Sequence, residues 1–252
     1  MSELRGIYTL WLREVKRYGR EKTRLISSFI QPLLWLIIFG SGMRLAATGT
    51  TGIDYQKFIF PGIVSQTLLF TSIFMGISVI WDREFGFMKE ILVAPISRAS
   101  VFVGKMLGGS TDAVIQGSFV FVYSFLVGIH LGLDTFLLSL PIMLLITFGM
   151  VSIGLTIASL MESLESFGVI QTFVNLPLFF LSGALFPLSY FPQWLGWVSA
   201  VDPLTYGVDA LRTIILSGQW TPILPLYYDI LVLVVFDATM ILVGTLIFGR
   251  TK

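Results

Sequence analysis

Residues 135–159 read TFLLSLPIMLLITFGMVSIGLTIAS, an apolar stretch without a charged side chain. A helix rises about 1.5 Å per residue, so about 20 apolar residues cross the hydrocarbon core of a bilayer. The stretch is therefore long enough to span a membrane as one helix. The length of this uncharged stretch decides the fold class, because a soluble globular domain does not need an apolar run long enough to cross a bilayer.

Outward from this stretch, the same pattern recurs along the chain. Apolar runs of similar length lie near 25–43, 58–80, 101–128, 135–159, 167–186 and 226–248. The 252 residues are 55% hydrophobic and only 12% charged, whereas a soluble domain has about 25% charged residues. We therefore predict an all-α polytopic membrane protein, with six transmembrane helices in a single transmembrane domain over 1–252.

Composition also excludes several kinds of site. The chain has no Cys, a single His and a net charge of +1, so disulfide frameworks, thiolate metal sites and nucleic-acid binding are not expected. No G-x-x-x-x-G-K-[ST] phosphate loop occurs. The lone His130 falls in a predicted short loop, where no Ser or Asp partner is indicated. We assign no catalytic residue, no metal and no cofactor to this chain.

The distribution of cations indicates the orientation. With both termini on one side, that side carries all of the 16 Lys and Arg residues except Arg44, Lys57 and Arg212. Lys and Arg are enriched in cytoplasmic connections of membrane proteins. The pattern predicts both termini in the cytoplasm of a multi-pass protein in the plasma membrane, and it supports an even number of spans.

Residues 4–20 have the periodicity of an amphipathic helix. Apolar side chains share one sector at 100° per residue, and the opposite sector is cationic and includes Arg13 and Arg17. The apolar residues are Leu4, Ile7, Tyr8, Trp11, Leu12, Val15 and Tyr18. We predict a helix on the inner membrane surface. It acts either as a basic anchor or as a helix that also contacts a cytoplasmic partner.

The largest predicted inner loop contains residues 82–94, DREFGFMKEILVA. The spacing of Phe85, Met88 and Leu92 predicts a short helix with one apolar ridge, which Pro95 ends. A ridge this short cannot span a membrane. It either lies under the bundle or fits the groove of a partner.

Residues 187–225 are apolar but interrupted by five prolines, which rules out one continuous crossing helix. Asp202 and Pro203 resemble an N-cap followed by proline at the first helical position. Aromatic residues, including Phe186, Trp194 and Tyr206, concentrate here, as at the headgroup level of a membrane. We predict a re-entrant helical hairpin over 187–218, before the last span.

Among the polar side chains inside predicted spans, we single out Asp112, Gln116 and Asp237. An ionisable group at the centre of a span costs about 2.5–3.5 kcal/mol on insertion scales, so these residues are expected to face the bundle or a wet cavity. Hydrogen bonding between helices is favoured over substrate contact.

Two separated motifs resemble those of one family. The family is that of the permease subunits of type-2 ATP-binding-cassette (ABC) exporters. The first motif resembles their inner loop and consists of residues 83–86 (REFG), 92–98 (LVAPISR) and 104–105 (GK). The second resembles the stretch before their last span and consists of residues 181–188 (LSGALFPL), 191–195 (FPQWL) and 202–212 (DPLTYGVDALR). Asp202 departs from the Asn common in that family, but both residues cap helices. The resemblance covers essentially the whole chain.

The resemblance implies that 82–94 is a coupling helix in contact with a separate ATPase. The implied contact residues are Arg83, Glu84, Phe85, Met88, Lys89, Glu90, Leu92, Pro95 and Arg98. The outer hairpin is expected to use Phe186, Pro187, Trp194, Asp202, Pro203, Tyr206 and Arg212. The family further implies a homodimer in membrane lipid with two ATPase subunits, which hold the ATP and Mg.

The function expected from this resemblance is outward transport of an amphipathic or hydrophobic compound, such as a drug, antibiotic or lipid. Export of a polysaccharide or lipo-oligosaccharide is the alternative within the family. A proton-coupled carrier using Asp112 and Asp237 is a different class, but it gives no role to the ridge at Phe85. A purely structural membrane subunit is the remaining class.

Overall fold

The computed structural model describes residues 3–42, 55–125 and 131–250, and every regular element in these ranges is a helix. The α-helices are α1 (Glu3–Arg20), α2 (Lys22–Gly42), α4 (Tyr55–Phe74), α5 (Ile77–Glu84), α6 (Phe87–Val93), α7 (Arg98–Val122), α8 (Leu133–Leu160), α9 (Leu164–Leu181), α10 (Gln193–Val201), α11 (Pro203–Ile215) and α12 (Leu226–Arg250). Short 3₁₀ turns lie at Tyr123–Phe125 and Leu188–Tyr190. The predicted all-α class is confirmed.

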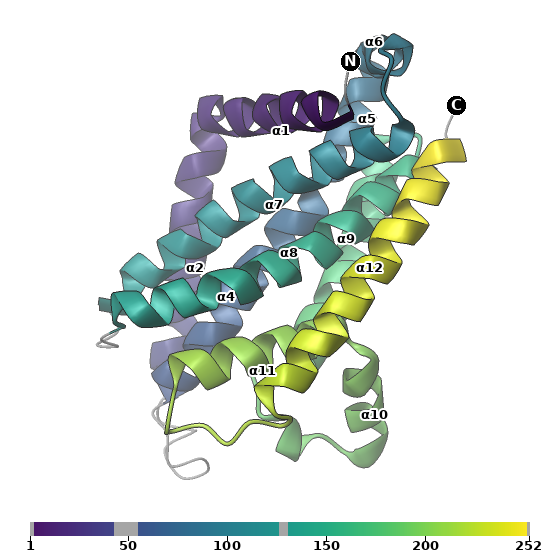
Figure 1. Ribbon diagram of the computed structural model, residues 1–252. Helices are drawn as coiled ribbons and strands as arrows, with labels where there is room; N and C mark the ends of the chain where they lie inside the picture. The colour runs from purple at the N-terminus through teal and green to yellow at the C-terminus, as the bar shows by residue number, and fades with distance from the viewer. Residues whose placement is uncertain (1–2, 43–54, 126–130, 251–252) are drawn as a thin grey trace.

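The long helices α2, α4, α7, α8, α9 and α12 form a bundle with two distinct ends (Figure 1). Helices α1 and α6 lie at one end, together with both chain termini, and we call it the α1 end. Helices α10 and α11 lie at the opposite end, which we call the α11 end. The sequence prediction that both termini share one side of the bundle agrees with this arrangement.

Four stretches are long and apolar enough to cross a membrane: Tyr55–Glu84, Leu133–Leu160, Leu164–Leu181 and Leu226–Gly249. The other two expected spans are also helical. However, the apolar part of α2 is the shorter Ile26–Gly40, and α7 includes Arg98, Lys105 and Asp112. These charges make α7 the least apolar of the long helices that were predicted to span.

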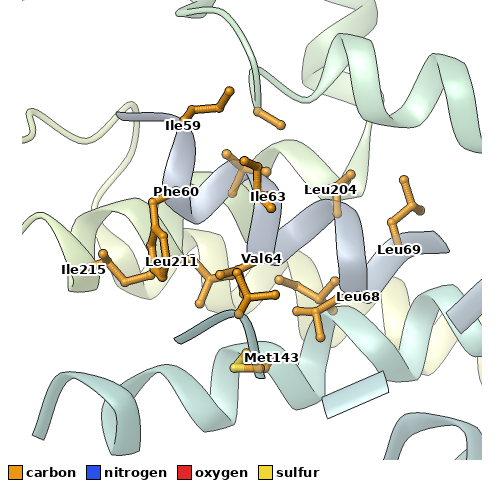
Figure 2. Packing of buried hydrophobic residues seen from close by; sticks show 14 of the residues in the cluster. Ile59, Phe60, Ile63, Val64, Leu68, Leu69, Met143, Leu204, Leu211 and Ile215 are labelled. Carbon is orange, nitrogen blue, oxygen red and sulfur yellow. The ribbon is translucent and has the colours of Figure 1, made fainter. Parts of the chain in front are cut away.

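Helix α4 forms the centre of the bundle. It packs against α2, α7, α8, α9 and α11, and its side chains from Phe58 to Leu69 are almost all buried. Figure 2 shows Val64 and Leu68 of α4 next to Met143 of α8, in the larger of two hydrophobic clusters. A Cβ on Gly62 would collide with the backbone of Ala184, so this glycine permits a close approach between α4 and the turn after α9.

That turn also corrects one helix boundary. The fifth span was predicted to reach residue 186, but α9 ends at Leu181. Gly183 has φ +75°, a left-handed conformation that favours glycine and ends helices. The chain therefore turns before residue 186.

Candidate functional site

The predicted single helix over 82–94 is wrong: the segment forms the end of α5 and the separate helix α6. The break is at Gly86, which has φ +81°. Other residues adopt this conformation at a steric cost, so Gly86 is suited to redirect the chain. Helix α6 thus projects from the α1 end as a short element of its own (Figure 1).

The break changes which apolar side chains are exposed. Phe85 is 70% exposed and Val93 is 86% exposed, and Phe87 is exposed as well. Met88, predicted on the ridge with Phe85, is only 7% exposed and belongs to the second hydrophobic cluster. The side chains of Lys89 and Leu92 lie outside the described residues. The described exposed apolar side chains of the 82–94 segment are therefore Phe85, Phe87 and Val93, bordered by the exposed Glu84, Glu90 and Pro95.

Two predicted contact cations instead bind helix ends within the chain. Arg83 donates to the carbonyls of Met161 (2.8 Å) and Ser159 (3.3 Å), where α8 ends. Arg98 donates to the carbonyl of Gly249, at 2.8 Å, near the end of α12. Cations stabilise helix C-termini because the last carbonyls lack partners and carry partial negative charge. These two arginines attach the 82–98 segment to the bundle.

A cluster of buried charges lies directly behind this surface. We define the charge cluster as Arg13 and Glu14 of α1, Asp82 of α5 and Lys105 of α7. The Nζ of Lys105 lies 2.5 Å from Asp82 Oδ2 and 3.4 Å from Glu14 Oε1, and it is also 3.3 Å from the Ser78 hydroxyl. Arg13 forms a bidentate pair with Asp82. The side chains of Glu14, Asp82 and Lys105 are almost completely inaccessible.

Electrostatics at Arg13 follow from this geometry. Burial is the largest single effect and lowers the pKa of the Arg13 guanidinium, but the Asp82 hydrogen bond and the charges of Asp82, Glu14 and Glu90 together raise it, and the net change is upward. Arg13 also lies 5.6 Å from the Phe87 ring, and Arg17 lies 4.6 Å from the Trp81 ring. The cluster thus joins α1, α5 and α7 and extends to the first residue of α6.

Helix α1 has three faces rather than the predicted two. Gly6, Leu10, Glu14 and Tyr18 are buried, and this face packs across α7 at Gly104 and Gly108. A Cβ at either glycine would meet α1 atoms, so the small residues allow close packing. Leu4 and Tyr8 remain exposed, and Trp11 donates to the Thr111 hydroxyl at 2.9 Å.

Inside the bundle, the three predicted polar residues are all buried. Gln116 accepts a hydrogen bond from the Thr71 hydroxyl at 3.0 Å, which links α7 to α4. Asp112 is one turn earlier on α7. Asp237 of α12 lies against Gly149 of α8, where an added Cβ would meet its carboxylate.

Comparison with known proteins gives this arrangement a family. The model of the protein family described as "ABC-2 type transporter" matches residues 5–216 of this chain. The chain is 31% identical to "Putative transport permease ycf38" of Cyanophora paradoxa over 98% of this chain and 89% of that protein. It is 25% identical to "Nodulation protein J" of Rhizobium leguminosarum bv. viciae, over 90% and 86%. It is 23% identical to "Inner membrane transport permease YadH" of Escherichia coli K12, over 91% and 90%.

The chain belongs to the ABC-2 type transporter family. It is a membrane protein of the transport permease type. Membership implies that an ABC-2 chain works with an ATP-binding subunit. The predicted resemblance to type-2 ABC permeases is therefore confirmed.

At the α11 end of this ABC-2 chain, the predicted cap of α11 is confirmed. Asp202 Oδ1 accepts from the Leu204 N–H at 2.9 Å, and Pro203 is the first helical residue. The Tyr206 hydroxyl donates to the Ala200 carbonyl at 2.7 Å. Phe186 and Trp194 are exposed, and Pro187 begins a 3₁₀ turn. The helix ends at Ile215.

Arg212, predicted in the outer hairpin, lies on α11 and is buried beneath this surface. It donates to the carbonyls of Gly183 (3.0 Å) and Ala184 (3.4 Å). Its guanidinium lies 4.0 Å from the Phe58 ring and 4.8 Å from the Trp220 ring. The cation therefore holds the turn after α9 against α4 and α11.

Sequence reasoning missed four residues of these two sites. Asp82 of the charge cluster is one of them, because it was named only as the start of the 82–94 segment. Lys105 and Glu14 of the charge cluster were not assigned, although a lysine within a predicted span is the same signal that singled out Asp112. Asp209 of α11 was also missed. Its carboxylate accepts from Trp220 Nε1 (2.9 Å) and from the N–H groups of Ile223 and Leu224.

Proposed function

We propose that this chain is the permease subunit of an ABC exporter, with the nucleotide chemistry on a separate ATPase. Two copies would form the translocation pathway and bind two ATPase subunits, which hold ATP and Mg. The exported compound is amphipathic or hydrophobic. The single observation that carries the proposal is an exposed apolar surface, Phe85, Phe87 and Val93, mounted on a buried charge cluster.

The proposed topology follows from charge and arrangement. Six spans are α2, α4 continued by α5, α7, α8, α9 and α12, and α10 and α11 form a re-entrant hairpin. The α1 end is cytoplasmic, because most Lys and Arg residues of the chain are concentrated there. The two chain termini at that end support an even number of crossings.

The charge cluster gives α6 a mechanical connection to the spans. Asp82 is two positions before the end of α5, and Lys105 is about two turns inside α7. A displacement of α6 by an ATPase acts on Asp82 and is passed to α7 through Lys105 and to α1 through Arg13. Ion pairs among buried groups resist separation, because a charge left without its partner costs about 3–5 kcal/mol. The interface therefore moves as one body with α1 and α7.

The test is a matched pair of truncations at the two ends of the bundle. Phe85→Ala removes a 70% exposed ring beside α6, and Phe125→Ala removes a 68% exposed ring after α7, at the far end. One buried apolar anchor contributes about 1.5–3 kcal/mol, so we expect Phe85→Ala to weaken co-purification of the ATP-binding subunit at least tenfold. Phe125→Ala is expected to leave it unchanged.

Transport in vesicles is measured in parallel. Export by the wild type is expected to need ATP and to survive collapse of the proton gradient by an ionophore. Equal co-purification for the two alanine variants would contradict the ATPase contact at α6. Transport that persists without ATP and stops with the ionophore would contradict the exporter assignment itself.

A further inference from the structure

Two adjoining hollows lie on α2. The inner one is a cavity of about 30 Å³ between α2, α4 and α7, large enough for one water-sized group. Its polar lining residues are Ser28, Gln31, Gln66, Thr67, Thr71 and Gln116. None of the residues that line it in the described ranges is charged.

The inner cavity contains hydrogen-bond donors that the protein does not use. Gln66 and Gln116 are each 4% exposed, and the Nε2 amide group of each has no hydrogen-bond partner. Thr71 donates to Gln116 Oε1 at 3.0 Å, which directs the other half of this amide elsewhere in the cavity. Buried donors are nearly always paired in proteins, and an unpaired one is costly. Two such donors in one cavity indicate a place for an uncharged acceptor oxygen.

The outer hollow has the opposite character. It measures about 430 Å³ and is lined along one side of α2 by Ser27, Ile30, Gln31, Leu34, Trp35, Ile38 and Phe39. Gln31 and Trp35 also line the inner cavity, so the two hollows are continuous at these residues. Trp35 stacks on Phe39 with ring centroids 4.8 Å apart. The volume of the outer hollow lies within the range of about 300–1,000 Å³ that small-molecule sites occupy.

We infer that these hollows form one binding site for a neutral amphiphile. An acceptor oxygen of the ligand, such as a hydroxyl, ether or ester oxygen, enters the inner cavity and accepts from Gln66 and Gln116. The hydrocarbon part lies along Ile30, Leu34 and Ile38. The absence of charge among the described lining residues selects against ammonium and sulfate headgroups, because neither would find a counter-ion. The inference rests on the proposed export function, because it names the class of compound that would be exported.

The test uses the full chain alone in lipid nanodiscs, without an ATPase. Three photoreactive probes share one alkyl chain with a diazirine and differ in headgroup: a glucoside, a trimethylammonium and a sulfate. After illumination, mass spectrometry measures the fraction of the 27–39 segment that carries a label. We expect the glucoside to label this segment about tenfold more than either charged probe, as one to two hydrogen bonds would provide.

Variants separate a specific site from simple partitioning. Gln66→Met and Gln116→Met keep side-chain length and remove the donors, and each is expected to lower glucoside labelling about fivefold to tenfold. Gln171→Met makes the same change on α9, outside the cavity, and is expected to have no effect. Melting temperature and gel filtration check that each variant is folded.

Equal labelling by all three probes, or equal labelling of wild type and both cavity variants, would overturn the inference. A second copy of the chain could instead cover α2. Efficient disulfide formation between two Leu34→Cys chains, with no glucoside label on 27–39, would likewise overturn it. None of these readouts involves ATP, so failure here leaves the exporter proposal standing, and failure of ATP-driven transport leaves the binding result standing.

Discussion

The two ends of the bundle hold buried charges in different ways. At the α1 end, Lys105 pairs with carboxylates from two other helices, Asp82 and Glu14. At the α11 end, Asp209 and Arg212 lie on the same helix and are satisfied mainly by backbone groups and aromatic rings. Long ionic side chains thus join separate helices at one end, whereas charges secure loops at the other.

This difference suits two tasks. A cation between two carboxylates can follow either helix, so under the proposed function the α1 end would transmit a displacement while it stays connected. Backbone hydrogen bonds and stacked rings have narrow geometric tolerance, so the α11 end closes the bundle with fixed loops. In the proposed exporter, the exposed aromatic residues beside α6 lie at the end that would contact the ATPase.

The largest expected effect separates the two ends by accessibility. The natural chain has no Cys, so Glu90→Cys at the α1 end and Ser189→Cys at the α11 end can be labelled without background. In intact cells, an impermeant maleimide is expected to label Ser189→Cys and not Glu90→Cys. Permeabilised cells should label both, which serves as the control. Labelling of Glu90→Cys from outside would invert the proposed orientation.

A smaller effect compares the two buried cations. Lys105→Met leaves Asp82 and Glu14 without their shared partner and is expected to lower the free energy of unfolding by about 3–5 kcal/mol. Arg212→Met removes cation–π contacts, carbonyl bonds and a favourable charge near Asp209, whose carboxylate keeps its three N–H donors, so about 1–3 kcal/mol is expected. Unfolding in mixed micelles measures both.

Lys16→Met, on an exposed position of α1, is the control for Lys105→Met and should change the free energy by less than about 0.5 kcal/mol. A double-mutant cycle of Lys105→Met with Asp82→Asn is expected to be strongly non-additive. If Arg212→Met costs more than Lys105→Met, the contrast between the ends is wrong.

The sequence predicted what depends on local pattern. Apolar length located the long helices, and the Asp202–Pro203 pair identified the start of α11, because capping involves neighbours in the chain. The ridge prediction failed at Met88 because Gly86 interrupts a spacing that assumes one unbroken helix. A glycine within a helical pattern does not reveal by itself whether it adopts a left-handed conformation.

Other features depend on contacts between distant segments. Lys105 is separated from Glu14 by 91 positions, and no local periodicity links them. The sequence also does not predict the third face of α1. A helix that crosses another at two glycines buries whichever side chains face the crossing. The charge cluster therefore required the structure, although Lys105 inside an apolar run was a usable warning.

The smallest expected effect concerns an exposed contact at the α1 end. Glu3 accepts from the Ser97 N–H at 3.1 Å and from the Ser97 hydroxyl at 3.1 Å. Hydrogen bonds from the Ser100 side chain and the Ser97 backbone lower the pKa of Glu3 below its ordinary value of 4.5. A carboxylate with a lowered pKa adds stability above its unfolded pKa, and this stability is lost as the pH falls through its folded pKa.

Glu3→Gln is therefore expected to have a slightly lower melting temperature than wild type at pH 7. The two melting temperatures should converge as the medium is acidified below pH 4.5. Glu162→Gln removes a carboxylate from an exposed turn at the same end and is the matched control, for which no such convergence is expected. Because Glu3 is exposed whereas Lys105 is buried, the same end of the bundle should show one small, pH-dependent contribution and one large contribution. A gap between Glu3→Gln and wild type that persists unchanged in acid would mean that the charge of Glu3 plays no part in docking α1 at Ser97.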